Sequence, residues 1–401
     1  MDFQLSEEQR AFKEVARKFC QKEVPPVLAE RAKTPEESAK VPLVVAMAPQ
    51  LEELGIRNLT VPEKYGGLGQ GFLTAAMLSE EFAYSGFPQV TTNWKWCLDF
   101  AAMASPELQD EFFPELVDNI AFCGGASMTE PSAIEDTHLP YNEPGAGIRT
   151  FAERDGDEWV INGGKAFCTT AASATHYILY ARTVKDKPLT ESVSAFLFPT
   201  DTEGFSIVRL NEFMGEPPDY NADTALDDAR IPERYLLGEL NKGYPYLGRL
   251  SRASIIVHHA GIIGAMQQMY EYTLDFTRGY VQGGKPIFEH KNVGPLIMEM
   301  AVQIESLRLV TYRAAWEYDQ SDRTQLNPMY FDIANALQKS VQMKVITNLL
   351  EACGNAAVIK DHPFEKFIRK MMISLHSGSA RNMNLIRLMQ VADDLRPTGA
   401  L

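Results

Sequence analysis

The periodicity of the sequence changes twice, and these two changes constrain the fold more than any other feature. Apolar side chains recur at helical spacing in residues 6–29, 43–54 and 74–83. Residues 156–229 instead contain short apolar runs separated by turn residues, without intervening helices. Helical spacing returns in residues 253–277, 290–319, 330–353 and 364–389. The pattern therefore predicts helices, then strands, then helices.

This order predicts an α+β chain, because consecutive short strands form a sheet or barrel and consecutive long helices pack into a bundle. We expect an N-terminal helical domain over residues 1–122 and a middle antiparallel β-barrel domain over residues 123–237. A C-terminal four-helix bundle over residues 238–401 completes the prediction. With 401 residues the chain is longer than a single core usually allows, which favours several packed units.

The net charge of -15 at neutral pH limits the expected partners. Its field repels phosphate backbones and anionic lipid surfaces, so nucleic acid and membranes are not expected as partners. The N-terminus lacks the basic start and apolar centre of a signal peptide, and no apolar stretch reaches the length of a membrane span. Five cysteines without a C-x-x-C pair are typical of reduced thiols and suggest no metal site. We expect a soluble, cytoplasmic protein.

Several short motifs follow one another along the chain. They read PEKYGGLG at residues 62–69, MTEP at 128–131, VINGGK at 160–165, LDDARIP at 226–232 and QGGKPI at 282–287. Each motif is weak alone, but their order and spacing make coincidence improbable. With these motifs the chain resembles the acyl-CoA dehydrogenases over nearly its whole length.

The resemblance implies FAD as the cofactor, held between the β domain and the C-terminal helices, with its adenine end reaching a neighbouring subunit. It therefore also implies a homo- or hetero-oligomer, a dimer or tetramer, and an electron-transfer flavoprotein as the acceptor. Phe167 stands where the family usually has tryptophan, and still provides a flat apolar wall. The alternative for these positions is simple packing within strands. The residues carried over to the flavin are Ala126, Met128, Thr129, Phe167, Thr169 and Ser379.

The implied reaction is α,β-dehydrogenation of an acyl-CoA thioester. A base removes the α proton while a hydride passes from the β carbon to flavin N5. The family's glutamate base lies in a turn near the C-terminus, where this sequence reads HSGS and Ser377 occupies the glutamate position. A serine without an activating partner does not take up such a proton. A second position used in the family, on the first long C-terminal helix, carries Ala253 and Ser254.

Two residues are candidates for the missing base. The imidazole of His376 exchanges a proton near neutral pH, although an ordinary hydrogen-bonded turn histidine is the alternative. Asp99 lies near the implied acyl pocket, where an apolar setting would raise its pKa, although a surface carboxylate is again the alternative. Trp94 and Trp96 either line this pocket or belong to the core. Glu135 replaces part of a glycine-rich turn and brings a carboxylate towards the implied CoA phosphates.

Two other functions remain open at this point. The chain could be the catalytically degenerate partner subunit of a heteromeric acyl-CoA dehydrogenase, whose companion supplies the base. It could also be a flavin-retaining lyase or monooxygenase. Acyl-CoA dehydrogenation stands first because the resemblance extends along the whole chain.

Overall fold

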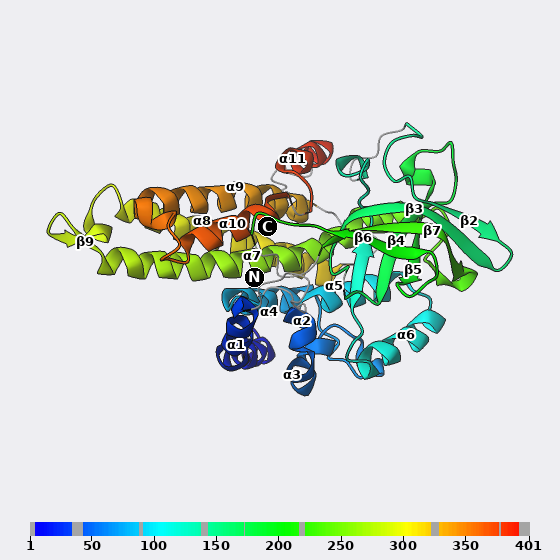
Figure 1. The fold of residues 1–401 in the computed structure, drawn as a ribbon, viewed down its shortest axis with the longest axis horizontal. Helices are drawn as coiled ribbons and strands as arrows, with labels where there is room; N and C mark the ends of the chain where they lie inside the picture. Colours follow the sequence, from blue (N-terminus) through cyan, green and yellow to red (C-terminus); the bar gives the residue numbers. More distant parts are fainter. Residues whose placement is uncertain are drawn as a thin grey trace.

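Helices form both ends of the chain and a sheet forms its middle, as Figure 1 shows. The computed structural model describes residues 5–33, 43–87, 91–137, 143–171, 173–215, 221–321, 329–376 and 378–392. This arrangement confirms the predicted order of a helical, a sheet-containing and a second helical region. The division at residues 122 and 237 stays a prediction.

The N-terminal region consists of helices, and side-chain caps begin α1 and α6. They are α1 (Glu7–Lys33), α2 (Leu43–Ala46), α3 (Ala48–Glu53), α4 (Phe72–Tyr84), α5 (Thr91–Met103) and α6 (Pro106–Asp118). At the start of α1, Gln9 N donates to Ser6 Oγ (3.1 Å) and Ser6 N donates to Gln9 Oε1 (3.0 Å). This reciprocal pair is a capping box. Ser105 also caps its helix, α6, because its Oγ accepts from Leu108 N at 3.3 Å.

The middle region is one mixed sheet. Its strands are β1 (Gly124–Ser127), β2 (Phe151–Asp155), β3 (Glu158–Cys168), β4 (His176–Arg182), β5 (Val193–Pro199), β6 (Phe205–Leu210), β7 (Ala222–Pro232) and β8 (Leu236–Leu237). Their order is β6-β7-β3-β2-β4-β5-β8, with β1 beside β4. The middle region is thus a β domain, as predicted, and most of its strand pairs are antiparallel. Strand β2 lies between β3 and β4 and pairs with β4 in parallel. Strand β1 also pairs with β4 in parallel.

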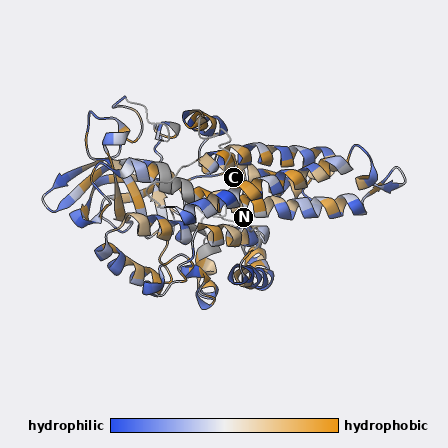
Figure 2. Ribbon diagram, turned by 180° about the vertical axis from the view of Figure 1, so that it is seen from behind, coloured by the Kyte–Doolittle hydropathy of each residue, from blue (hydrophilic) through white to orange (hydrophobic). Residues whose placement is uncertain are grey.

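Long helices form the C-terminal region and extend away from the sheet (Figure 1). They are α7 (Gly243–Gly279), α8 (Gly294–Gln320) and α9 (Met329–Cys353), followed by the shorter α10 (Phe364–Ile373) and α11 (Arg381–Gln390). A small hairpin, β9 (Val281–Gln282) with β10 (Lys285–Pro286), joins α7 to α8 at the far tip. Apolar residues gather between these helices, as Figure 2 shows.

One predicted helix is wrong in this region. The pattern of residues 364–389 predicted a continuous fourth helix, but the structure interrupts it between α10 and α11. The interruption includes Gly378, whose φ of 72° lies in the left-handed region that a helix does not use. A Cβ at this glycine would lie 2.7 Å from Ile255 Cδ1, so the turn packs directly on α7. Among the described helices, none combines the length and hydropathy needed to cross a membrane.

A carboxylate from α8 holds the N-terminus of α4. Asp319 Oδ1 accepts from Phe72 N (2.8 Å) and Asp319 Oδ2 accepts from Leu73 N (2.9 Å). The preceding Gly71 provides no side-chain cap, and a Cβ there would lie 2.3 Å from Asp319 Oδ1. Asp319 therefore satisfies two unpaired helix N–H groups and complements the helix dipole from 246 residues away in the sequence.

We predict that Asp319→Ala lowers the free energy of unfolding by about 1–2 kcal/mol, because two N–H groups of α4 lose their acceptor. Urea unfolding followed by circular dichroism measures the change. Asp275→Ala, which removes an exposed carboxylate from α7, is the matched control and should change stability little. Equal effects of the two substitutions would contradict the capping role.

Candidate active site

The residues expected at the flavin lie where β1 ends beside β3. Thr129 O accepts from Ala166 N (2.8 Å), and Ser127 Oγ lies 3.4 Å from Cys168 Sγ. These contacts bring the two expected groups of flavin residues together, although they are about forty residues apart in the sequence. Ala126 and Thr169 are exposed, whereas Met128 and Thr129 are half-buried.

Phe167 presents its ring to solvent because the backbone of β3 is irregular at this point. The register between β3 and β7 shifts between Lys165 and Cys168, and Phe167 has a φ of 56°. Asp223 Oδ1 accepts from Phe167 N (3.2 Å), and Asn221 Nδ2 donates to Phe167 O (2.8 Å). These bonds hold a conformation that is costly for an aromatic residue. As a result, 50% of the Phe167 side chain is exposed.

A buried ion pair supports this surface from below. Lys165 Nζ donates to Glu130 Oε1 (2.8 Å), Tyr180 O (2.7 Å) and Met128 O (3.2 Å). Glu130 also accepts from the backbone N–H groups of Arg149 and Thr150. Burial alone would raise the pKa of Glu130, but Lys165 and these donors outweigh it and hold the pKa below its ordinary value.

The turn between α10 and α11 is anchored to two helices of the bundle. Asn335 Nδ2 donates to Gly378 O (2.8 Å), and Asn335 Oδ1 lies 3.0 Å from His259 Nε2. Ser379 is buried and has a φ of 99°. The side chain of His376 and the whole of Ser377 lie outside the described residues. The positions that carry Ala253 and Ser254 belong to α7.

Asp99 lies on α5 and is buried. Burial is the main cause that raises the pKa of the Tyr180 hydroxyl on β4, and the nearby charge of Asp99 raises it further. Glu135 belongs to a short 3-10 turn (Glu135–Thr137), and its side chain lies outside the described part. The structure therefore places Asp99 at the junction of the N-terminal helices and the sheet.

The two tryptophans on α5 are packed inside the molecule. Trp94 is 0% exposed, and its Nε1 donates to Ile56 O at 2.7 Å. Trp96 is 3% exposed and stacks on Phe100 with ring centroids 4.6 Å apart. Neither indole reaches an open surface of the described structure, which favours the core alternative for both. Contact with a substrate stays a prediction.

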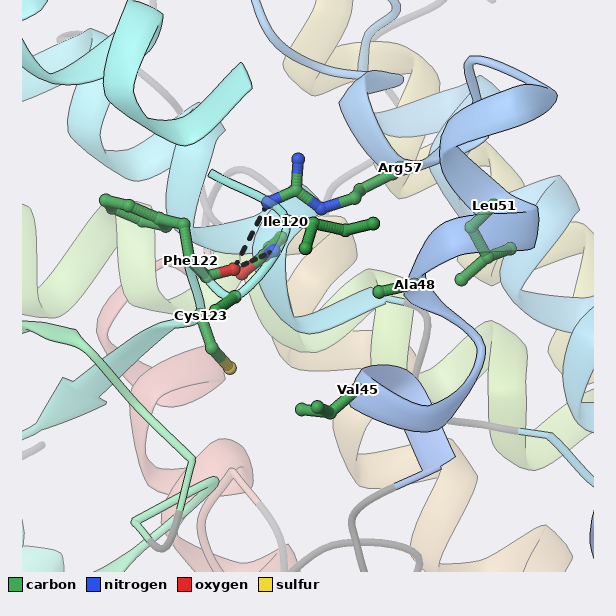
Figure 3. A pocket seen from close by; sticks show the side chains of 9 residues that line it. Val45, Ala48, Leu51, Arg57, Ile120, Phe122 and Cys123 are labelled. Atoms are coloured by element: carbon green, nitrogen blue, oxygen red, sulfur yellow. Dashed lines mark hydrogen bonds between the residues drawn. The ribbon is translucent and has the colours of Figure 1, made fainter. Parts of the chain in front are cut away.

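A pocket lies between α2–α3 and the start of β1, and Figure 3 shows it from close by. Arg57 is its charged lining residue. Its Nη1 donates to Leu116 O (2.8 Å), while its Nη2 donates to Asn119 O (2.7 Å) and Phe122 O (3.4 Å). These hydrogen bonds tie the guanidinium to the end of α6 and the segment before β1, so Arg57 stabilises the packing of the N-terminal region. The residues that line the pocket include none of the expected site residues.

Sequence reasoning missed the side chains that hold the site in place. Asn221 and Asp223 form hydrogen bonds with Phe167. Asn335 bonds the backbone of Gly378, next to Ser379, and His259 Nε2 lies 3.0 Å from Asn335 Oδ1. The single local signal was the presence of polar side chains in otherwise apolar helical runs, as at His259 and Asn335.

We predict that Glu130→Gln lowers the free energy of unfolding by about 3–5 kcal/mol, because Lys165 is left buried without its carboxylate. The folded pKa of Glu130 is lowered, so its contribution is present above the ordinary carboxyl pKa and is lost as the pH falls through the folded value. The difference in the free energy of unfolding between wild type and Glu130→Gln should therefore become smaller at acidic pH. Denaturant unfolding at several pH values measures it.

Glu153→Gln, at an exposed position on β2, is the matched control and should leave both stability and its pH dependence nearly unchanged. A Glu130→Gln variant that matched this control would show that the pair does not hold the strands together.

Comparisons with known proteins agree with this architecture. Three family models match the chain: the acyl-CoA dehydrogenase N-terminal domain over residues 6–119, the middle domain over residues 125–229 and the C-terminal domain over residues 244–387. A probable acyl-CoA dehydrogenase of Bacillus subtilis, YngJ, is 26% identical and covers 98% of this chain and 100% of its own length. Cyclohexane-1-carbonyl-CoA dehydrogenase of Syntrophus aciditrophicus is 28% identical over 86% of this chain and 88% of that protein.

Among solved structures, butyryl-CoA dehydrogenase from Megasphaera elsdenii has the same fold. It superposes with a TM-score of 0.85 at 23% identity, covering 98% of this chain and all of that one. A glutaryl-coenzyme A dehydrogenase complex gives a TM-score of 0.85 at 24% identity, over 98% of this chain and 97% of that one. With matches to all three domains in order, this chain belongs to the acyl-CoA dehydrogenase family.

Proposed function

We propose that this protein is an FAD-dependent oxidoreductase that dehydrogenates an acyl-CoA thioester between its α and β carbons. The observation that carries the proposal is the exposed, conformationally strained Phe167 beside Ala126 and Thr129. An exposed aromatic ring on a fixed bulge fits the face of a planar heterocycle. The lyase, monooxygenase and degenerate-subunit alternatives are not favoured by the comparisons.

Residues of this chain would hold FAD and position the substrate. Ala126, Met128, Thr129, Phe167, Thr169 and Ser379 are the proposed flavin contacts, and when bound, FAD supplies the hydride acceptor. The Glu130–Lys165 pair ties the segment that follows β1 to β3 beneath these contacts, so their relative positions are fixed before a ligand arrives. The Asn335–Gly378 bond fixes the last turn against the bundle in the same way.

The proton acceptor is the remaining catalytic role, and Asp99 and His376 are its candidates. Asp99 is a carboxylate in a buried setting, which suits uptake of a weakly acidic α proton. His376 directly precedes Ser377, at the family's glutamate position. Trp94, Trp96 and Glu135 remain proposed substrate neighbours, with the tryptophans acting as the packed support of α5.

We also infer an oligomer, either homomeric or with a companion chain, and transfer of electrons to an electron-transfer flavoprotein. Met298, Val302, Leu309 and Trp316 form an exposed apolar stripe along α8, which favours contact with another subunit. A location in the cytoplasm fits the buried cysteines, which form no disulfide in the described part of the chain, but stays a proposal.

The purified protein is predicted to show flavin absorption that bleaches when an acyl-CoA is added without oxygen. Phe167→Ala should lower FAD affinity by roughly tenfold to a hundredfold, because a stacked ring contributes about 1–3 kcal/mol. Fluorescence titration of the FAD-free protein measures the affinity. Phe205→Ala, a half-buried ring within the sheet core, is the control for general destabilisation. Protein that purifies without flavin and does not bind added FAD would overturn the proposal.

If Asp99 is the base, Asp99→Asn should slow anaerobic flavin bleaching by about 100-fold or more while FAD binding is retained. In that case His376→Gln, which tests the other candidate base, should change the rate of flavin bleaching little. The reverse result would assign the base to His376. Bleaching at the wild-type rate in both variants would exclude both residues as the proton acceptor.

A further inference from the structure

A basic cluster that the proposed chemistry does not use lies around the last turn. Ile255 on α7 contacts the Gly378 position, and His258 and His259 follow one helical turn later on the same face. Opposite them on α9, Asn335 binds Gly378 O and Lys339 Nζ reaches Ser374 O at 3.4 Å. Two helices therefore place basic side chains around the turn at the family's glutamate position.

His258 differs from its neighbour in its hydrogen bonding. His259 Nε2 lies 3.0 Å from Asn335 Oδ1, so His259 helps to anchor the turn. The Nε2 atom of His258 is buried and has no hydrogen-bond partner among the described residues. A buried ring nitrogen without a partner loses its hydrogen bonds to water without replacement. A polar atom of a ligand would provide that partner.

The electrostatic surroundings of His258 are positive. Burial is the first cause that lowers its pKa to about 3, and the charges of Lys95 on α5 and Lys339 on α9 lower it further. The imidazole is therefore neutral at ordinary pH and is a poor acceptor for the α proton. It can still share a hydrogen bond, and the two nearby ammonium groups favour a negatively charged partner.

We propose that His258, in the positive potential of Lys95 and Lys339, forms a subsite for a carboxylate at the far end of the acyl group. The preferred substrates are then CoA thioesters of dicarboxylic acids, in place of plain aliphatic acyl-CoAs. This inference rests on the proposed function, because it assigns the acyl group of the same reaction.

The test compares two chain-matched, unreactive thioethers, S-(ω-carboxybutyl)-CoA and S-pentyl-CoA, by calorimetry with the FAD-loaded protein. Neither compound has the thioester carbonyl that acidifies the α proton, so binding is measured without turnover. Wild type should bind the carboxylate-ended compound at least about tenfold more tightly, because hydrogen bonds to charged groups are stronger than neutral ones.

His258→Phe should weaken binding of the carboxylate-ended compound by about tenfold to a hundredfold and leave S-pentyl-CoA binding nearly unchanged. His258→Gln should recover part of the loss, because its amide can still donate a hydrogen bond. His362→Phe, at a histidine whose ring meets the ring of Phe276 edge-to-face, is the matched control. Thermal unfolding of each variant checks that it is folded.

Equal binding of the two thioethers by wild type, or equal weakening of both by His258→Phe, would overturn the subsite and leave the proposed dehydrogenation intact. Binding of neither thioether, together with absence of bleaching by any acyl-CoA, would overturn the proposed function and the subsite with it. A clear preference for the carboxylate that His258→Phe abolishes would support both.

Discussion

The Glu130–Lys165 pair is the interaction on which the arrangement of the sheet depends. Its two charges are almost completely buried, and they survive there because each finds several partners. These partners belong to the segment just before β2, to β4 and to the segment after β1, so one ion pair on β3 links the neighbourhoods of four strands. The bulge that contains Phe167 lies between Lys165 and Cys168, directly after the residue that forms the ion pair.

Helix α7 is the corresponding fixed element of the bundle, because it contacts all three regions. Ser79 Oγ of α4 donates to its Val257 O, and its early residues lie beside β5. The final turn then packs on Ile255 and is tied by Asn335. The bonds that anchor this turn to α9 use the backbone oxygens of Gly378 and Ser374.

The sequence predicts repeated patterns well and isolated contacts poorly. Helix α1, with its Ser6–Gln9 cap, and the apolar, fully buried strands β4 and β5 follow from local rules, so these elements were expected. Strand β1 has the sequence GGAS, which carries no strand signal, and it forms because β4 offers it a partner. The break between α10 and α11 depends on packing against α7, which a helical pattern does not contain. Trp94 could be assigned to the core only once its bond to Ile56 O was visible.

Strained backbone conformations also depend on contacts between distant parts of the chain, which local sequence patterns do not contain. Among the residues that the structure describes, five non-glycine residues have positive φ, and Phe167, Thr170 and Ser379 lie in or beside the proposed flavin contacts. Each such conformation costs about 1–3 kcal/mol and persists only where its surroundings determine it. Asn221 and Asp223 hold the backbone of Phe167 by hydrogen bonds, and the bond from Asn335 to Gly378 O holds the turn that contains Ser379. Two of these strained residues, Phe167 and Ser379, are thus among those proposed to hold the cofactor, and in both cases contacts from distant parts of the chain hold the strained backbone.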